Sequence, residues 1–190
     1  MSGLKLPKLA AVAVVVAGLF AADAHAASIY NFAEVGNDVV AVGSGSANIT
    51  GLTFFVNSSS QVVLEASSGN FLAGTPGINF QFTGTNVLSP VTGFEPGNMV
   101  NNFPTISVGD YFGLSAFNGR LFVLANYISG SPLNNSATWT NRTFTSLGLT
   151  QGTYVYTFNT GANADTLTIN IPSAVPEPAS LSLVVGWGRS

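Results

Sequence analysis

Hydrophobic and polar residues alternate in short stretches along the middle of the chain, and this pattern predicts β-strands. The clearest stretches are Ile78–Thr83, Thr153–Phe158 and Asp165–Ile171, where aromatic or aliphatic side chains mostly alternate with Thr, Asn or Gln. Successive side chains of a strand point to opposite faces, so each stretch should present one face to a core and the other to water. No stretch after residue 26 shows ten or more residues at helical spacing.

Shorter apolar stretches between turn residues predict the remaining strands. These further strands are Ile29–Glu34, Asp38–Val42, Leu52–Val56, Gln61–Ala66, Tyr111–Phe117 and Leu121–Ala125. The turn signals are Gly36-Asn37-Asp38, Asn57-Ser58-Ser59, Asn118-Gly119 and Gly161-Ala162-Asn163. Asn118-Gly119 predicts a two-residue hairpin turn, because both residues accept positive φ. Ser89–Pro104, with three prolines, predicts a long irregular connection.

Regularly spaced short strands without helices predict an all-β fold. We expect a single antiparallel β-sandwich of jelly-roll-like form. The pattern alone does not exclude a closed barrel. The sandwich should cover residues 27–172. An N-terminal signal helix (residues 1–26) should precede it, and a short unstructured tail (residues 173–190) should follow.

Composition sharpens this picture, because the chain carries very little charge. Of 190 residues, 46% are hydrophobic and 7% are charged, against about 25% charged in typical soluble domains. Ser, Thr, Asn and Gly must therefore supply most of the polar surface. The net charge of −3 disfavours nucleic acid or an anionic membrane as a partner. The chain has no cysteine, which excludes disulfides and thiolate metal sites.

The first 26 residues have the pattern of a secretory signal peptide. Lys5 and Lys8 form a positive region, an apolar run follows from Leu9 to Ala22, and Ala24-His25-Ala26 matches an A-x-A cleavage site. Export through the Sec machinery and cleavage by signal peptidase would release a chain that starts at Ala27. The alternative is an uncleaved anchor helix, but the run is shorter than the ~20 residues that a span needs. The released chain would carry no stable transmembrane span.

The released chain lacks the usual catalytic side chains, and we expect no enzyme activity. It has no His, Lys or Cys, so the common nucleophile–base pairs and imidazole metal sites are absent. A hydrolase using two carboxylates, for example Glu95 and Asp110, stays open as an alternative. Asn163 and Asp165 share one turn, which favours an Asx-turn over a calcium site. No cofactor or metal is expected.

Aromatic residues could form a platform for sugar rings, which is the main alternative for binding. Trp139 is the first candidate, and Tyr111, Tyr127 and Arg120 are candidate neighbours. Trp139 stands between Thr138 and Thr140, however, and this alternation is typical of an ordinary strand with Trp139 in the core.

The C-terminal motif Val175-Pro176-Glu177-Pro178-Ala179-Ser180 resembles the PEP-CTERM sorting signal of exported Gram-negative bacterial proteins. The resemblance implies processing by an exosortase and delivery to the cell surface or the exopolysaccharide matrix of a biofilm. Most of the released chain resembles one subgroup of these proteins, which has no established activity and therefore supplies no catalytic residues to transfer. In the family an apolar span and an Arg-rich cluster follow the motif. Here only the eight apolar or small residues 181–188 and Arg189 follow, so a helix there would reach ~12 Å of a ~30 Å hydrocarbon core.

These observations favour an exported β-sandwich protein without catalytic activity, at the cell surface or in the extracellular matrix. It would carry a degenerate sorting signal and remain in the periplasm, on the surface or outside the cell. The alternative function is a carbohydrate-binding module that holds exopolysaccharide.

Overall fold

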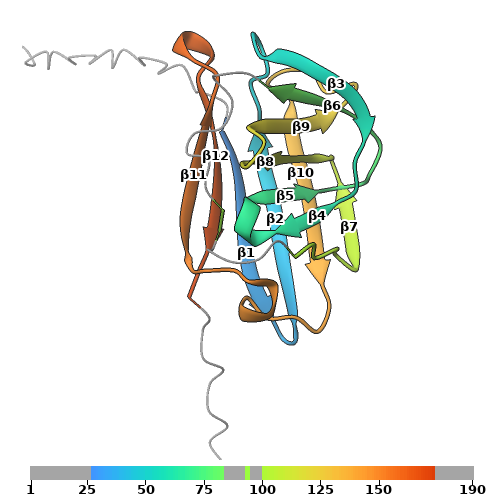
Figure 1. Cartoon of the computed structure of the whole chain (residues 1–190), viewed down its shortest axis with the longest axis vertical. Coiled ribbons are helices and arrows are strands. Elements are labelled where there is room, and N and C mark those ends of the chain that lie inside the picture. The colour runs from blue at the N-terminus through green and yellow to red at the C-terminus, as the bar shows by residue number, and fades with distance from the viewer. Residues whose placement is uncertain (1–26, 84–92, 95–99, 174–190) are drawn as a thin grey trace, which may run out of the picture.

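The computed structural model describes residues 27–83, 93–94 and 100–173 and shows two six-stranded sheets packed face to face (Figure 1). The strands of sheet A, in spatial order, are β11 (Gly152–Phe158), β12 (Asp165–Ile171), β1 (Ala27–Val35), β2 (Asp38–Ser46), β10 (Pro132–Trp139) and β7 (Ile106–Gly109). The strands of sheet B are β3 (Thr53–Ser59), β6 (Ile78–Thr83), β9 (Arg120–Leu124), β8 (Phe112–Ser115), β5 (Asn70–Ala73) and β4 (Val63–Glu65). The prediction of an all-β sandwich is confirmed.

The strands of sheet B run across those of sheet A, as Figure 1 shows. Three short 3-10 helices lie in the connections: η1 (Ala66–Ser68), η2 (Thr145–Leu147) and η3 (Gly161–Asn163). All strand pairs are antiparallel except β1 with β12, which pair in parallel from Ala27 opposite Thr166. The first and last strands of the sandwich are therefore neighbours in sheet A, an arrangement that the alternation pattern did not predict.

An aromatic core lies between the two sheets. Tyr30 and Phe32 of β1 pack against Phe71 of β5, with ring centroids 4.6 Å and 5.2 Å apart. Trp139 of β10 stacks on Phe32 at 6.1 Å. These rings are all at most 2% exposed, so burying them supplies much of the hydrophobic stabilisation, about 1.5–3 kcal/mol for each fully buried side chain.

Buried hydrogen bonds also join the two sheets. The Tyr30 hydroxyl donates to the carbonyl of Phe112 on sheet B (3.0 Å). The Asn135 side chain on sheet A donates to the Tyr30 hydroxyl (2.8 Å) and to the Asp110 carbonyl (2.7 Å). Buried polar groups are costly unless they are paired, so these bonds favour one relative placement of the sheets.

Alternation assigned the faces of β11 and β12 correctly. Tyr156 and Phe158 are buried, Thr153, Val155 and Thr157 are exposed, and Leu167, Ile169 and Ile171 are buried. In β6 the prediction that the polar face contacts water is wrong, because Asn79 is 0% and Gln81 is 7% exposed. On the neighbouring strand β3, Ser58 stands opposite Asn79 and bonds to both side chains. Ile78, predicted for the core, is 62% exposed at the first position of the strand.

The turn predictions hold in part. Gly36 and Asn37 form the two-residue turn of the β1–β2 hairpin, with Gly36 at φ 60°. The β8–β9 hairpin is confirmed, but its loop has four residues, 116–119, and only Gly119 takes a positive φ. A hydrogen bond from the Gly119 amide to the Ala116 carbonyl (3.1 Å) closes this longer turn.

Other differences from the predicted elements are local. Asn57-Ser58-Ser59 belongs to β3, because pairing with β6 supplies backbone partners that override the turn preference of these residues. Strands β5, β7 and β10 were not predicted, apart from the alternation at Trp139. Strands β5 and β7 have only four residues each, β5 has three consecutive buried ones, and β10 carries the polar Asn135 on its buried face. Within the described residues, no helix is long and apolar enough to cross a membrane. The predicted signal peptide and the sorting motif lie outside the described residues.

Candidate functional site

Trp139, the first candidate for a sugar platform, lies in the core. Its ring is 2% exposed, and its indole Nε1 donates to the carbonyl of Asn102 (3.2 Å). A ring that stacks on a sugar must offer a free face, and this ring has none. The interpretation of Trp139 as a binding residue is therefore wrong, whereas its interpretation as a core residue of a strand is confirmed.

Tyr111 and Tyr127 come together at another place, beside a pocket of about 210 Å³ that also includes Asp110. Tyr111 is fully buried, and burial raises its pKa above the usual range. Tyr127 is half-buried, and its hydroxyl contacts the backbone of Ala47 and the carbonyl of Ser131. Burial also raises the pKa of Tyr127, partly offset by its hydrogen bond to Ala47. Both side chains thus serve packing and loop closure rather than an open platform.

Most of the described carboxylates accept hydrogen bonds from backbone amides. Glu34 accepts from Phe144, and Asp38 accepts from Asn141. Asp110, one half of the candidate hydrolase pair, accepts from the Asn134 amide (2.8 Å). Its predicted partner Glu95 lies outside the described residues. These carboxylates hold loops and strand ends together.

Asp165 has the same kind of role. Its Oδ1 accepts from the amide of Thr166 and its Oδ2 from the amide of Asn48, both at 2.6 Å. The carboxylate is buried at 2% exposure and ties the start of β12 to the chain after β2. Among the described residues, no group of three or more His, Cys, Asp or Glu side chains could hold a metal ion.

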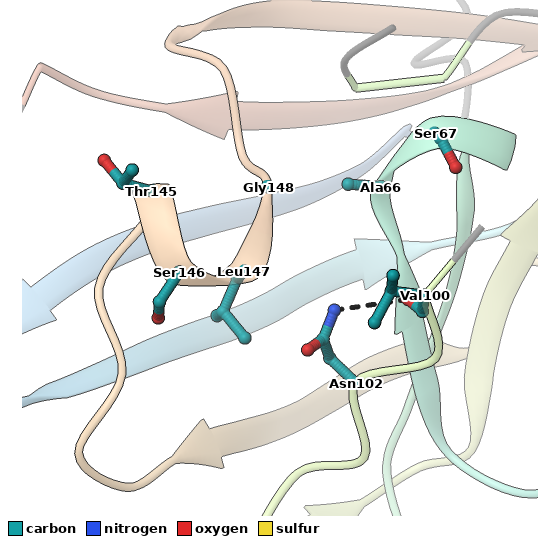
Figure 2. Close-up of a pocket in the computed structure, with 8 residues that line it drawn as sticks. All are labelled: Ala66, Ser67, Val100, Asn102, Thr145, Ser146, Leu147 and Gly148. Atoms are coloured by element: carbon teal, nitrogen blue, oxygen red, sulfur yellow. Dashed lines mark hydrogen bonds between the residues drawn. The ribbon is translucent and has the colours of Figure 1, made fainter. Parts of the chain in front are cut away.

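One pocket of about 230 Å³ lies between η2 and the segment around Val100 and Asn102. Figure 2 shows Leu147 pointing toward these two residues, while Thr145 points away. The Asn102 side chain donates to the Val100 carbonyl (3.2 Å). The residues that line this pocket carry no charge, so it offers few groups for specific recognition.

A larger groove, about 360 Å³, lies on the outer face of sheet B, and we call it the sheet-B groove. Leu72 and Phe122 form its apolar floor, in one cross-strand row with Gln81. Asn70, Ser115 and Arg120 form the next row. The side chains that carry amides in the groove are Gln61, Asn70, Gln81, Asn101 and Asn118.

Arg120 is held in place at one side of the groove. Its Nη1 donates to the Oε1 of Gln81 (3.2 Å), and its guanidinium carbon lies 4.2 Å from the ring centroid of Phe55. Gln81 is itself buried, and its Nε2 donates to the Ser58 hydroxyl. A planar guanidinium fixed by an amide and an aromatic face loses little freedom when it binds a ligand.

The rim of the groove combines an exposed ring with further polar groups. Phe103 lines the groove and is 57% exposed. The Asn118 side chain donates to the Ser115 hydroxyl (3.2 Å), which orients both side chains. Within the described residues, the lining contains one cation and no carboxylate. The groove can therefore bind a ligand through hydrogen bonds, one positive charge and ring contacts, and the lining residues that the structure describes include no acid–base pair.

Sequence reasoning named Arg120 only as a neighbour of Trp139 and placed Gln81 in water. One signal could have found the groove, because Arg120 is one of only three arginines after residue 26. It directly follows the Asn118-Gly119 turn signal, and a cation in such a sparsely charged chain stands out. In comparisons with known proteins, no family model matches the chain, and neither a curated protein nor a solved structure matches it.

Proposed function

We propose that the protein is an exported β-sandwich that binds polysaccharide at the cell surface or in the extracellular matrix and has no catalytic activity. The observation that carries this proposal is the sheet-B groove. It brings five amide side chains, the fixed guanidinium of Arg120 and the exposed ring of Phe103 together on one face. Among the described residues, no carboxylate accompanies them in the lining.

The chemistry of the groove suits a ligand rich in hydroxyl groups. An amide side chain offers both a donor and an acceptor, as each sugar hydroxyl does. The exposed ring of Phe103 can cover the carbon-bound hydrogens of a sugar ring. A few placed polar groups around an apolar surface are the usual composition of a ligand site. The groove thus favours the carbohydrate-binding form of the proposed function.

The absence of catalysis has separate support. Glycoside hydrolysis needs two carboxylates across the scissile bond. Glu34, Asp38, Asp110 and Asp165 instead accept bonds from backbone amides, and none of them lines the groove.

Export is supported by the signal-peptide pattern and by the resemblance of the tail to a sorting signal. Signal peptidase and an exosortase are the partners that these segments imply. Strand β1 begins at Ala27, so cleavage before this residue would leave every described strand intact. The mature protein should therefore begin with strand β1.

Mass spectrometry of the exported protein tests this processing. We expect an N-terminal peptide that starts at Ala27, because the A-x-A site ends at Ala26. A mature pool that retains residues 1–26 would contradict export with cleavage and would place the protein at the inner membrane.

Substitution of Phe103 tests the groove as a glycan site. Because the exposed ring offers a packing surface, Phe103→Ala should weaken polysaccharide binding at least fivefold, corresponding to about 1 kcal/mol. Its melting temperature should stay close to that of the native protein, since the ring is 57% exposed. The measurement is retardation of the full-length expression product in native gels that contain polygalacturonate or galactan.

Phe117→Ala is the matched control, because Phe117 is 63% exposed but does not line the groove. It should bind like the native protein. Equal retardation of both variants would argue against the groove, and no retardation of the native protein by any polysaccharide would overturn the proposed function.

A further inference from the structure

From Arg120 and its surroundings we infer that the sheet-B groove selects a carboxylated polysaccharide, one built with uronic acid residues. This inference rests on the proposed function and names its ligand class.

Within the part of the chain that the structure describes, the contacts of Arg120 leave its charge without an acidic counterpart. Among the described residues its two specific contacts are a neutral amide, Gln81, and the ring of Phe55. A guanidinium has five N–H donors, and only one is used in the bond to Gln81. The remaining donors form a fork that suits the two oxygens of a carboxylate.

The position of the fork is set before a ligand arrives. Gln81 is 7% exposed and bonded to Ser58, and Ser58 also contacts Asn79, which is fully buried. Arg120 therefore rests on a buried polar network through Gln81 and on the half-exposed ring of Phe55. Such preorganisation reduces the entropy lost on binding and makes the geometry of the anion matter.

The nearest described acid in this pattern is Glu65. It shares the cross-strand row Glu65, Asn70, Ser115 and Arg120, so its backbone is three strand spacings, about 14 Å, from that of Arg120. This separation exceeds the Debye length of about 8 Å at 0.15 M salt. Among the described residues, the fork of Arg120 therefore keeps its positive charge without a carboxylate partner.

The overall negative charge also explains why the fork should decide specificity. A net charge of −3 repels a polyanion at low salt, so a broad electrostatic attraction cannot account for binding. A carboxylated polymer can bind only where a local contact outweighs this repulsion. The amide side chains of the groove would then contact the hydroxyl groups of the same sugar units. A carboxylate polymer without sugars has no such hydroxyl groups.

The test compares four probes with the full-length expression product at 0.15 M salt: polygalacturonate, neutral galactan, dextran sulfate and poly-L-glutamate. We expect polygalacturonate to bind at least tenfold more tightly than each of the other three. Arg120→Gln should lose at least tenfold of this affinity, because charge-assisted bidentate bonds are lost. Arg120→Lys keeps the charge but not the fork, so it should recover only part of the affinity.

Arg142→Gln is the matched control, since Arg142 is exposed and does not line the groove. It removes the same charge and should bind polygalacturonate like the native protein. Thermal melting of each variant confirms that the fold is kept. If Arg120→Gln does not fold, Arg120→Lys carries the test, and a full native affinity for this variant would overturn the inference.

The outcomes separate the inference from the proposed function. Equal binding of galactan and polygalacturonate would overturn carboxylate selection while leaving polysaccharide binding in place. Equal binding of dextran sulfate or poly-L-glutamate would overturn it too, because the groove would then recognise charge alone. No binding of any polysaccharide would overturn both.

Discussion

Replacing Tyr156 with Asp should unfold the protein or lower its free energy of unfolding by at least about 4 kcal/mol. Tyr156 lies on the inner face of β11 and is 1% exposed. Its ring packs edge-on against Phe94 at 6.2 Å, and across the strands it stands opposite Leu167. An aspartate there would bury a charge in an apolar site. Typical domains have only 5–15 kcal/mol in total, so the effect should be evident in urea unfolding curves.

Val155→Asp provides the comparison within the same strand. Val155 points to the other face and is 45% exposed, so the charge would stay in water. The cost should be below about 1 kcal/mol, mostly from the lower strand propensity of Asp. Similar losses for both variants would show that the faces of β11 are wrongly assigned.

Replacing Trp139 with Ala should lower the free energy of unfolding by about 4 kcal/mol, the usual range for removing a buried aromatic ring. The ring contacts Phe32 and Phe71 with centroids 6.1 Å and 6.4 Å away, so its removal would leave a cavity beside them. The indole also holds Asn102, whose backbone pairs with Leu64 next to sheet B. Urea unfolding with an unchanged m-value would report this loss as stability alone.

Trp139→Phe separates the contribution of ring packing in the core from that of the indole hydrogen bond. It keeps an aromatic ring in the core but removes the N–H group that donates to Asn102, so it should cost less than half as much as Trp139→Ala. A Trp139→Ala variant with native stability would contradict the core placement and would return this residue to the candidates for an exposed platform.

Alternation in the sequence was enough to predict the class of fold. Strands β11 and β12 were found with their faces correct, because both have one side covered and the other in water. Alternation failed where both faces of a strand are covered. In β6, Asn79 and Gln81 look like surface residues, yet both are buried and bond to Ser58 of the neighbouring strand β3.

The candidate site shows why long-range packing is difficult to derive from one sequence. Arg120, Gln81 and Asn70 come from three strands that only the order of sheet B brings together. No spacing in the chain encodes this neighbourhood, and the buried network that fixes Arg120 depends on the same order. Trp139 illustrates the opposite case, since its alternation with Thr138 and Thr140 already indicated the core.

The most direct test of the account is to map where a polysaccharide binds. The ¹⁵N-labelled protein, 19.5 kDa as the full chain, would be titrated with tetragalacturonate and separately with galactotetraose. For at least one ligand, the account predicts saturable amide shifts that cluster at Gln81, Phe103, Ser115 and Arg120. Shifts that gather instead on the outer face of sheet A, around Val42 and Thr168, or no shifts with either ligand, would contradict the sheet-B groove as the binding site.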